Sequence, residues 1–132
     1  MSIRNKADKA VQERLLKSMT YELIPLKNLA DQSMFLPDGS TVSVTCSPAK
    51  TVDDTLDLCA HYGGQGFTVI PHLAARMVED EEHVERIVRR INELGIRTVF
   101  CIGGDAEPRG PFTDTAGFLR SFLDRRPEID TV

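Results

Sequence analysis

The chain has 132 residues and a formal net charge of −4, with 41% hydrophobic and 27% charged residues. These values fit one soluble globular domain, and the acidic balance gives no electrostatic reason to expect a nucleic-acid or membrane partner. No apolar run approaches the roughly 20 residues of a membrane span, and the charged start lacks a signal-peptide core. The three cysteines lack C-x-x-C spacing, so we expect neither a disulfide framework nor a metal site, and a reducing, cytoplasmic setting.

Residues 1–20 are interpreted as an N-terminal helical extension. The spacing over residues 5–18 is helical, with an apolar stripe comprising Ala7, Ala10, Val11, Leu15 and Leu16. The basic residues between these positions favour a solvated face, and a binding role for them is the alternative.

Residues 21–25 are expected to form a short strand that Pro25 ends. Glu22 lies between apolar neighbours in this strand. If it is buried and neutral, its pKa is raised as a general acid requires. The pattern alone favours the other possibility, in which Glu22 faces solvent from an edge strand.

Two further strands are expected, at residues 41–46 and 67–73, after a connector over residues 27–40. A helix between the strands has Thr51 as its N-cap and ends at Gly63-Gly64-Gln65-Gly66. These glycines precede a strand and therefore do not match a dinucleotide fingerprint. Pro71 predicts a bulge or a strand end, because it removes a ladder donor. His72 is either a hydrogen-bonded core histidine or a site residue.

The clearest helix in the sequence lies within residues 77–94 and ends at Gly95. Its acidic start and His83 are expected on the surface. Residues 98–102 then form an apolar strand that breaks into Gly103-Gly104-Asp105. This break is either a simple turn or a site, since an acid at the C-terminal end of a parallel strand stands where α/β proteins place their chemistry.

A last helix is predicted from Thr113 or Asp114 to Arg125, and residues 129–132 start another strand. Strands that alternate with helices predict an α/β fold of parallel (β/α) units. The spacing fits a TIM barrel or an open doubly wound sheet, and the pattern does not separate the two.

Four segments together resemble methylenetetrahydrofolate reductases. They are Tyr21-Glu-Leu-Ile-Pro25, Val42-Ser-Val-Thr45, Pro71-His-Leu73 and Gly103-Gly-Asp105, in the order and spacing of four strand-end motifs of that family. The resemblance covers residue 21 to the end of the chain. It implies a TIM barrel in residues 21–132, of which about the first half is present.

The resemblance also implies a cytoplasmic flavoprotein of one-carbon metabolism and methionine biosynthesis. FAD would accept a hydride from NAD(P)H and reduce 5,10-methylenetetrahydrofolate to 5-methyltetrahydrofolate, so the expected partner is a folate. Glu22 matches the general acid of the family, and Asp105 matches its acid near flavin and folate. Thr45, His72, Gly103, Gly104 and Asp105 match cofactor-binding positions, and no metal is implied.

Two departures from the family pattern stand out. Gly103 replaces an Arg that precedes Gly-Asp in the family, which removes a cation expected near the flavin. The chain also stops at the fifth of eight strands, so we expect either self-association or a missing C-terminal barrel half, and doubtful activity in isolation. The alternatives are a non-catalytic folate- or flavin-binding module, and a small α/β interaction unit with fortuitous motif matches.

Overall fold

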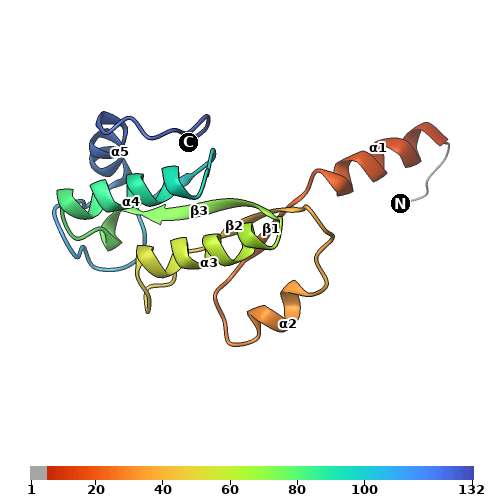
Figure 1. Cartoon of the computed structure of the whole chain (residues 1–132), viewed down its shortest axis with the longest axis horizontal. Helices are drawn as coiled ribbons and strands as arrows, with labels where there is room; N and C mark the ends of the chain where they lie inside the picture. Colours follow the sequence, from red (N-terminus) through yellow and green to blue (C-terminus); the bar gives the residue numbers. More distant parts are fainter. Residues whose placement is uncertain (1–5) are drawn as a thin grey trace.

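The computed structural model describes residues 6–132, in which short helices alternate with short strands (Figure 1). The helices are α1 (Lys6–Lys17), α2 (Leu29–Ser33), α3 (Val52–Gly64), α4 (Glu81–Glu93) and α5 (Thr115–Asp124), with a 3-10 turn, η1, at Ala75–Met77. The strands are β1 (Thr20–Leu23), β2 (Thr41–Val44), β3 (Thr68–Ala74) and β4 (Phe100–Ile102).

The four strands form one parallel sheet in the order β1-β2-β3-β4. This arrangement confirms the α/β class and the parallel (β/α) units predicted from the sequence. Beyond β4, Thr98 forms a parallel bridge with Thr131, and the Val99 amide donates to the Thr131 carbonyl at 3.1 Å. The expected strand start at residues 129–132 therefore lies beside β4.

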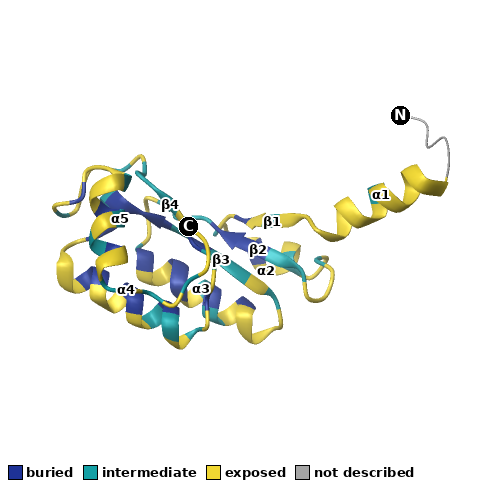
Figure 2. Ribbon diagram, turned by 90° about the horizontal axis from the view of Figure 1, so that it is seen from above, coloured by how far each residue is buried: buried dark blue, intermediate teal, exposed yellow. Residues whose placement is uncertain are grey.

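One face of the sheet carries the core. Figure 2 shows α3 and α4 packed on this face, where the inward side chains of the strands are fully buried. The most deeply buried members are Val42, Val44 and Leu73 from the sheet, Leu56 from α3, Ile87 and Ile91 from α4, and Phe118 and Phe122 from α5. Helix α3 starts with the predicted N-cap, since Thr51 and Asp54 form a reciprocal capping box.

The opposite face of the sheet is not covered by any helix of the described chain (Figure 2). Parallel sheets are usually covered on both faces. Here Phe100 is 51% exposed, and Glu22 is also exposed on edge strand β1. We call this surface the open face.

The prediction of a bulge or strand end at Pro71 was wrong, because β3 continues through it to Ala74. The Thr68 amide donates toward β2, to the Ser40 carbonyl, and successive amides point to opposite sides of a strand. The missing N–H of Pro71 therefore faces β4, where pairing begins only at His72. No ladder bond is lost.

The expectation that His83 lies on the surface was also wrong, since its side chain is almost fully buried. Its Nδ1 accepts from the Glu79 amide at 3.2 Å, which places the proton on Nε2. That nitrogen lies 3.2 Å from Oδ2 of Asp53 in the first turn of α3, without the alignment of a hydrogen bond. His83 thus joins α3 to the start of α4.

Helix α1 projects away from the body and has no buried residue (Figure 1). The prediction of a helix at residues 5–18 is confirmed over Lys6–Lys17, while residue 5 lies outside the described residues. Within residues 6–132, no helix combines the length and the apolar character needed to cross a membrane.

Candidate functional site

The open face carries a shallow cavity of about 400 Å³. The strand register places Glu22 of β1 beside Ser43 of β2 and Ser43 beside Ile70 of β3. His72 lies two residues further along β3 and pairs with Phe100 of β4. The cavity is also lined by Thr20, Ile70, Thr98, Val99, Thr131 and Val132. A mostly apolar hollow with a few convergent polar groups is the usual form of a small-molecule site.

Glu22 and His72 form the ionisable pair of this cavity. Glu22 Oε1 lies 3.9 Å from His72 Nε2, and the carboxylate side chain is 57% exposed while the imidazole is 12% exposed. The His72 ring also packs against Phe100 with 4.8 Å between ring centroids. Burial lowers the pKa of His72 and the Glu22 carboxylate raises it, with burial the larger effect. The imidazole is therefore neutral at neutral pH.

The position of Glu22 agrees with the interpretation that the sequence pattern alone favoured, a carboxylate on the solvent side of an edge strand. The position of His72 combines features of the two predicted alternatives, a core histidine and a site residue. Its ring is nearly buried, as in a core histidine, yet it lines a cavity beside a carboxylate.

The backbone carbonyl of His72 has a side-chain partner outside the cavity. This carbonyl accepts from the Cys46 thiol at 2.8 Å, and Thr55 of α3 contacts the same sulfur at 3.8 Å. Burial raises the pKa of the Cys46 thiol, which keeps it protonated as the donor. This contact between residues 26 positions apart was not predicted from the sequence.

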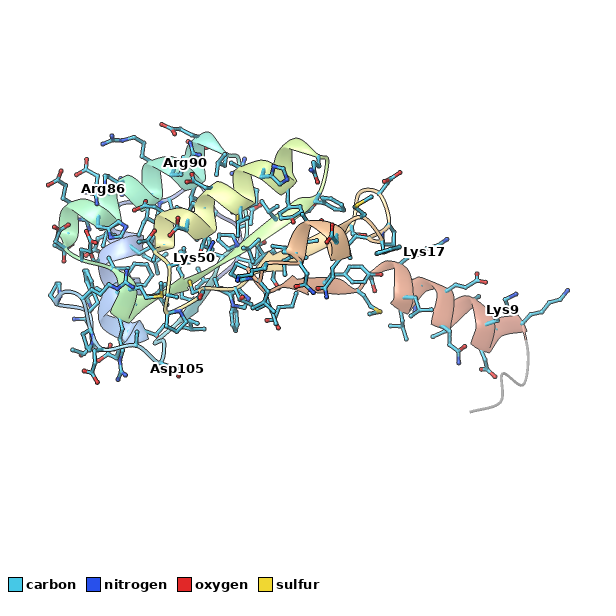
Figure 3. The ribbon with its side chains drawn as sticks, turned by 90° about the horizontal axis from the view of Figure 1, so that it is seen from below. Lys9, Lys17, Lys50, Arg86, Arg90 and Asp105 are labelled. Atoms are coloured by element: carbon cyan, nitrogen blue, oxygen red, sulfur yellow. The ribbon has the colours of Figure 1, made fainter. Side chains whose placement is uncertain are left out.

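The other predicted site residues lie at the C-terminal edge of the sheet and do not line the cavity. Thr45 follows β2 and donates its amide to Leu23 O at 3.0 Å, and its hydroxyl reaches the same carbonyl at 3.3 Å. Gly103 and Gly104 follow β4, and Asp105 points outward into solvent (Figure 3).

Position 104 favours glycine over other residues, because its backbone adopts a φ of +89°. A Cβ at this position would also lie 3.2 Å from Cβ of Ala74 at the end of β3. The turn is thus packed closely against the end of β3, whereas a simple surface loop need not contact a neighbouring strand.

Two arginines that the sequence analysis did not single out organise this edge. The Arg76 amide donates to Gly103 O at 3.0 Å, and its Nε donates to Thr113 O at 2.9 Å. Arg109 donates its amide to Arg76 O at 2.8 Å and its guanidinium to the carbonyls of Pro48 and Lys50. The loops after β2, β3 and β4 are therefore joined beside the Gly-Gly-Asp turn.

No family model matches this chain. In residues 6–132, no cluster of three or more His, Cys, Asp or Glu side chains has the arrangement to hold a metal ion. Chemically, the site offers a solvated carboxylate next to a neutral imidazole on an open apolar face, with a second carboxylate at the nearby strand edge.

Proposed function

We propose that this chain carries the first half of a methylenetetrahydrofolate reductase-like oxidoreductase, with FAD as cofactor, NAD(P)H as hydride source and 5,10-methylenetetrahydrofolate as substrate. The observation that supports this most is the pairing of Glu22 with His72 on the open face of a parallel sheet. These residues come from two of the four segments that resemble the family.

The residues on the open face fit a flavin. An apolar surface built by Ile70 and Phe100 beside a neutral imidazole suits a planar ring with polar edges. Thr45, His72, Gly103, Gly104 and Asp105 would hold the cofactor, with Thr45 and residues 103–105 contacting it from the C-terminal edge of the sheet. When bound, the flavin supplies hydride transfer between the nicotinamide and the folate.

Glu22 is proposed as the proton donor to the folate. Protonation of a ring nitrogen by the carboxylic acid opens the imidazolidine ring of the substrate, which leaves an electrophilic iminium carbon ready for reduction. His72 would orient the Glu22 side chain, since the two lie 3.9 Å apart. Asp105 would bind the pterin and stabilise its developing positive charge.

Arg76 is proposed to supply the cation that Gly103 lacks. It is the second residue after β3, and its Cβ lies 4.0 Å from the position of a Cβ built on Gly104. Its guanidinium is exposed and uses Nε to bind Thr113 O, which leaves its terminal nitrogens as donors.

We further propose that the sheet is the first half of a TIM barrel. Four parallel strands carry their helices on one face, as the outer ring of a barrel requires, and the catalytic candidates lie on the other face or at the C-terminal edge. The parallel bridge between Thr98 and Thr131 is the pairing that a fifth strand would make.

A Glu22→Gln variant tests the function. Flavin reduction by NAD(P)H and folate reduction by the reduced flavin are measured separately in anaerobic stopped flow. We expect the substitution to spare the first step and slow the second by about 10²–10⁴-fold, the usual contribution of a general acid. Equal rates of folate reduction in both proteins would exclude Glu22 as the acid.

A non-catalytic folate- or flavin-binding module is the second candidate. The exposure of Glu22 favours it, because a carboxylate with more than half of its surface in water is not held as a catalytic acid usually is. This candidate predicts flavin or folate binding without NAD(P)H oxidation, in the same stopped-flow series.

A further inference from the structure

Helix α1 presents an unpaired apolar stripe to solvent. Val11 and Leu15 lie one turn apart on the same side, and Leu15 is 58% exposed. Leu16 and Met19 extend the apolar surface and are also exposed. An amphipathic helix is normally stabilised by burying such a stripe, so we expect this stripe to pack against another apolar surface.

The body of the molecule offers a groove at the end of the sheet from which α1 leaves. The groove has a volume of about 710 Å³ and is lined by the first residues of two strands, Thr41 and Thr68, and by the C-terminal ends of α3 and α4. The β4 side of β3 is unpaired here, because pairing between the strands begins only at His72. Gly63, Gly64 and Gly95 line the groove and leave room for a helix to approach closely.

The charges of the helix and the body are complementary. Helix α1 contains four basic and two acidic residues, and Figure 3 shows Lys9 and Lys17 on its projecting surface. Residues 18–132 contain 18 acidic and 11 basic residues, a net charge of −7. The two helices that end at the groove add partial negative charge there, although Glu93 and Arg97 on its walls offset each other. Two α1 helices would instead repel each other.

The connection between α1 and β1 directs the helix away from its own groove. The helical hydrogen bonds continue into the linker, since the Ser18 amide donates to Arg14 O and the Met19 amide donates to Leu16 O. Strand β1 starts at Thr20, so only Ser18 and Met19 lie between the two elements, and neither is glycine or proline. A return to the same body would have to reverse the chain within two residues.

We propose that the Val11–Leu15 stripe of α1 docks into this groove on a second copy of the chain. Reciprocal docking gives a closed two-fold dimer, in which each copy contributes one helix and one groove. This inference does not depend on the proposed function, because it uses the opposite end of the sheet from the Gly-Gly-Asp turn.

The experiment is sedimentation velocity of the full chain over a range of concentrations. We expect a dimer whose dissociation constant rises at least tenfold with Leu15→Glu, which places a charge in the stripe. Thr68→Arg should have the same effect, because this exposed residue lines the groove and the new cation repels a basic helix. Lys17→Gln is the matched control, with the same change of net charge on the opposite side of the helix, and should change the constant less than twofold.

A mixture of the two disrupted variants gives the sharpest result. The Leu15→Glu chain keeps an intact groove and the Thr68→Arg chain keeps an intact helix, so the mixture should form heterodimers although each variant alone is monomeric. Circular dichroism checks that both remain folded, and Thr41→Arg replaces Thr68→Arg if the latter unfolds. The proposal is overturned if the unmodified chain is monomeric throughout, if Leu15→Glu leaves the dimer intact, or if the groove variants do not dissociate it.

Discussion

Glu22 and His72 influence each other through charge across 3.9 Å. Burial lowers the pKa of the imidazole, and the carboxylate offsets part of that effect by stabilising the imidazolium. The exposure of Glu22 weakens this attraction, because water screens it. The pKa of His72 therefore depends on how much of the open face is covered. A ligand that excludes water would strengthen the attraction between the carboxylate and the imidazolium.

A Glu22→Gln substitution should lower the pKa of His72 further. The neutral amide cannot stabilise the imidazolium, whereas the burial that disfavours it is unchanged. An NMR titration of the His72 ring measures the pKa directly. Glu13→Gln on α1 is the control and should leave the titration where it is. A His72 pKa that is unchanged or raised by Glu22→Gln would show that the two side chains are not coupled.

At the scale of elements, the loop after β4 is fixed more firmly than its Gly-Pro composition suggests. Arg109 joins it to the loops after β2 and β3, and Arg76, which follows β3, donates to its carbonyls at Gly103 and Thr113. Gly110 lies against the backbone of residues 78 and 79 so closely that no side chain fits. Three strand-end loops consequently behave as one unit at the proposed site.

Gly110→Ala should destabilise the protein by about 1–3 kcal/mol, the usual cost of overpacking, because its Cβ would overlap the carbonyl groups of Glu79 and Val78. Urea unfolding followed by circular dichroism gives the free energy. Gly64→Ala is the control, since a Cβ there meets nothing within 4 Å, and it should be neutral or slightly stabilising. Equal stabilities of the two variants would mean that the loop is not packed as described.

The strongly periodic elements could be predicted from the sequence, because local pattern determines them. The N-cap Thr51 and the apolar repeat of α4 predicted their helices, and α4 lies inside the predicted range of residues 77–94. The five-residue α2 was missed within the expected connector, since so short a helix has almost no periodicity. Pro71 was misjudged because its tolerance depends on where β4 begins pairing, a tertiary fact.

The candidate site could be predicted only in part, for a similar reason. Parallel strands bring their ends to one edge, so the positions of Thr45, Gly104 and Asp105 follow from the strand assignment alone. The 3.9 Å approach of Glu22 to His72 depends on the register of three strands. The carbonyl contacts of Arg109 and the buried His83 depend on packing between loops and helices, which sequence spacing does not encode.

At the scale of the whole molecule, one face of the sheet is left uncovered by helices in residues 6–132. It exposes Phe100 and the Glu22–His72 pair, where α/β proteins usually have a second layer or a barrel interior. The groove at the other end of the sheet and the projecting α1 add a second surface suited to association. The groove and the open-face cavity share Ile70 and Thr98 in their walls, so dimer formation should be measured both with and without ligand.

The visible absorption spectrum of the purified chain, after incubation with excess FAD and removal of free flavin, tests the central claim most directly. We predict retained flavin bands, reduced in a His72→Ala variant and unchanged in a Leu16→Ala control on α1. A protein that stays colourless, and that leaves the spectrum of free FAD unperturbed at high concentration, would contradict the assignment of this open face as a flavin site.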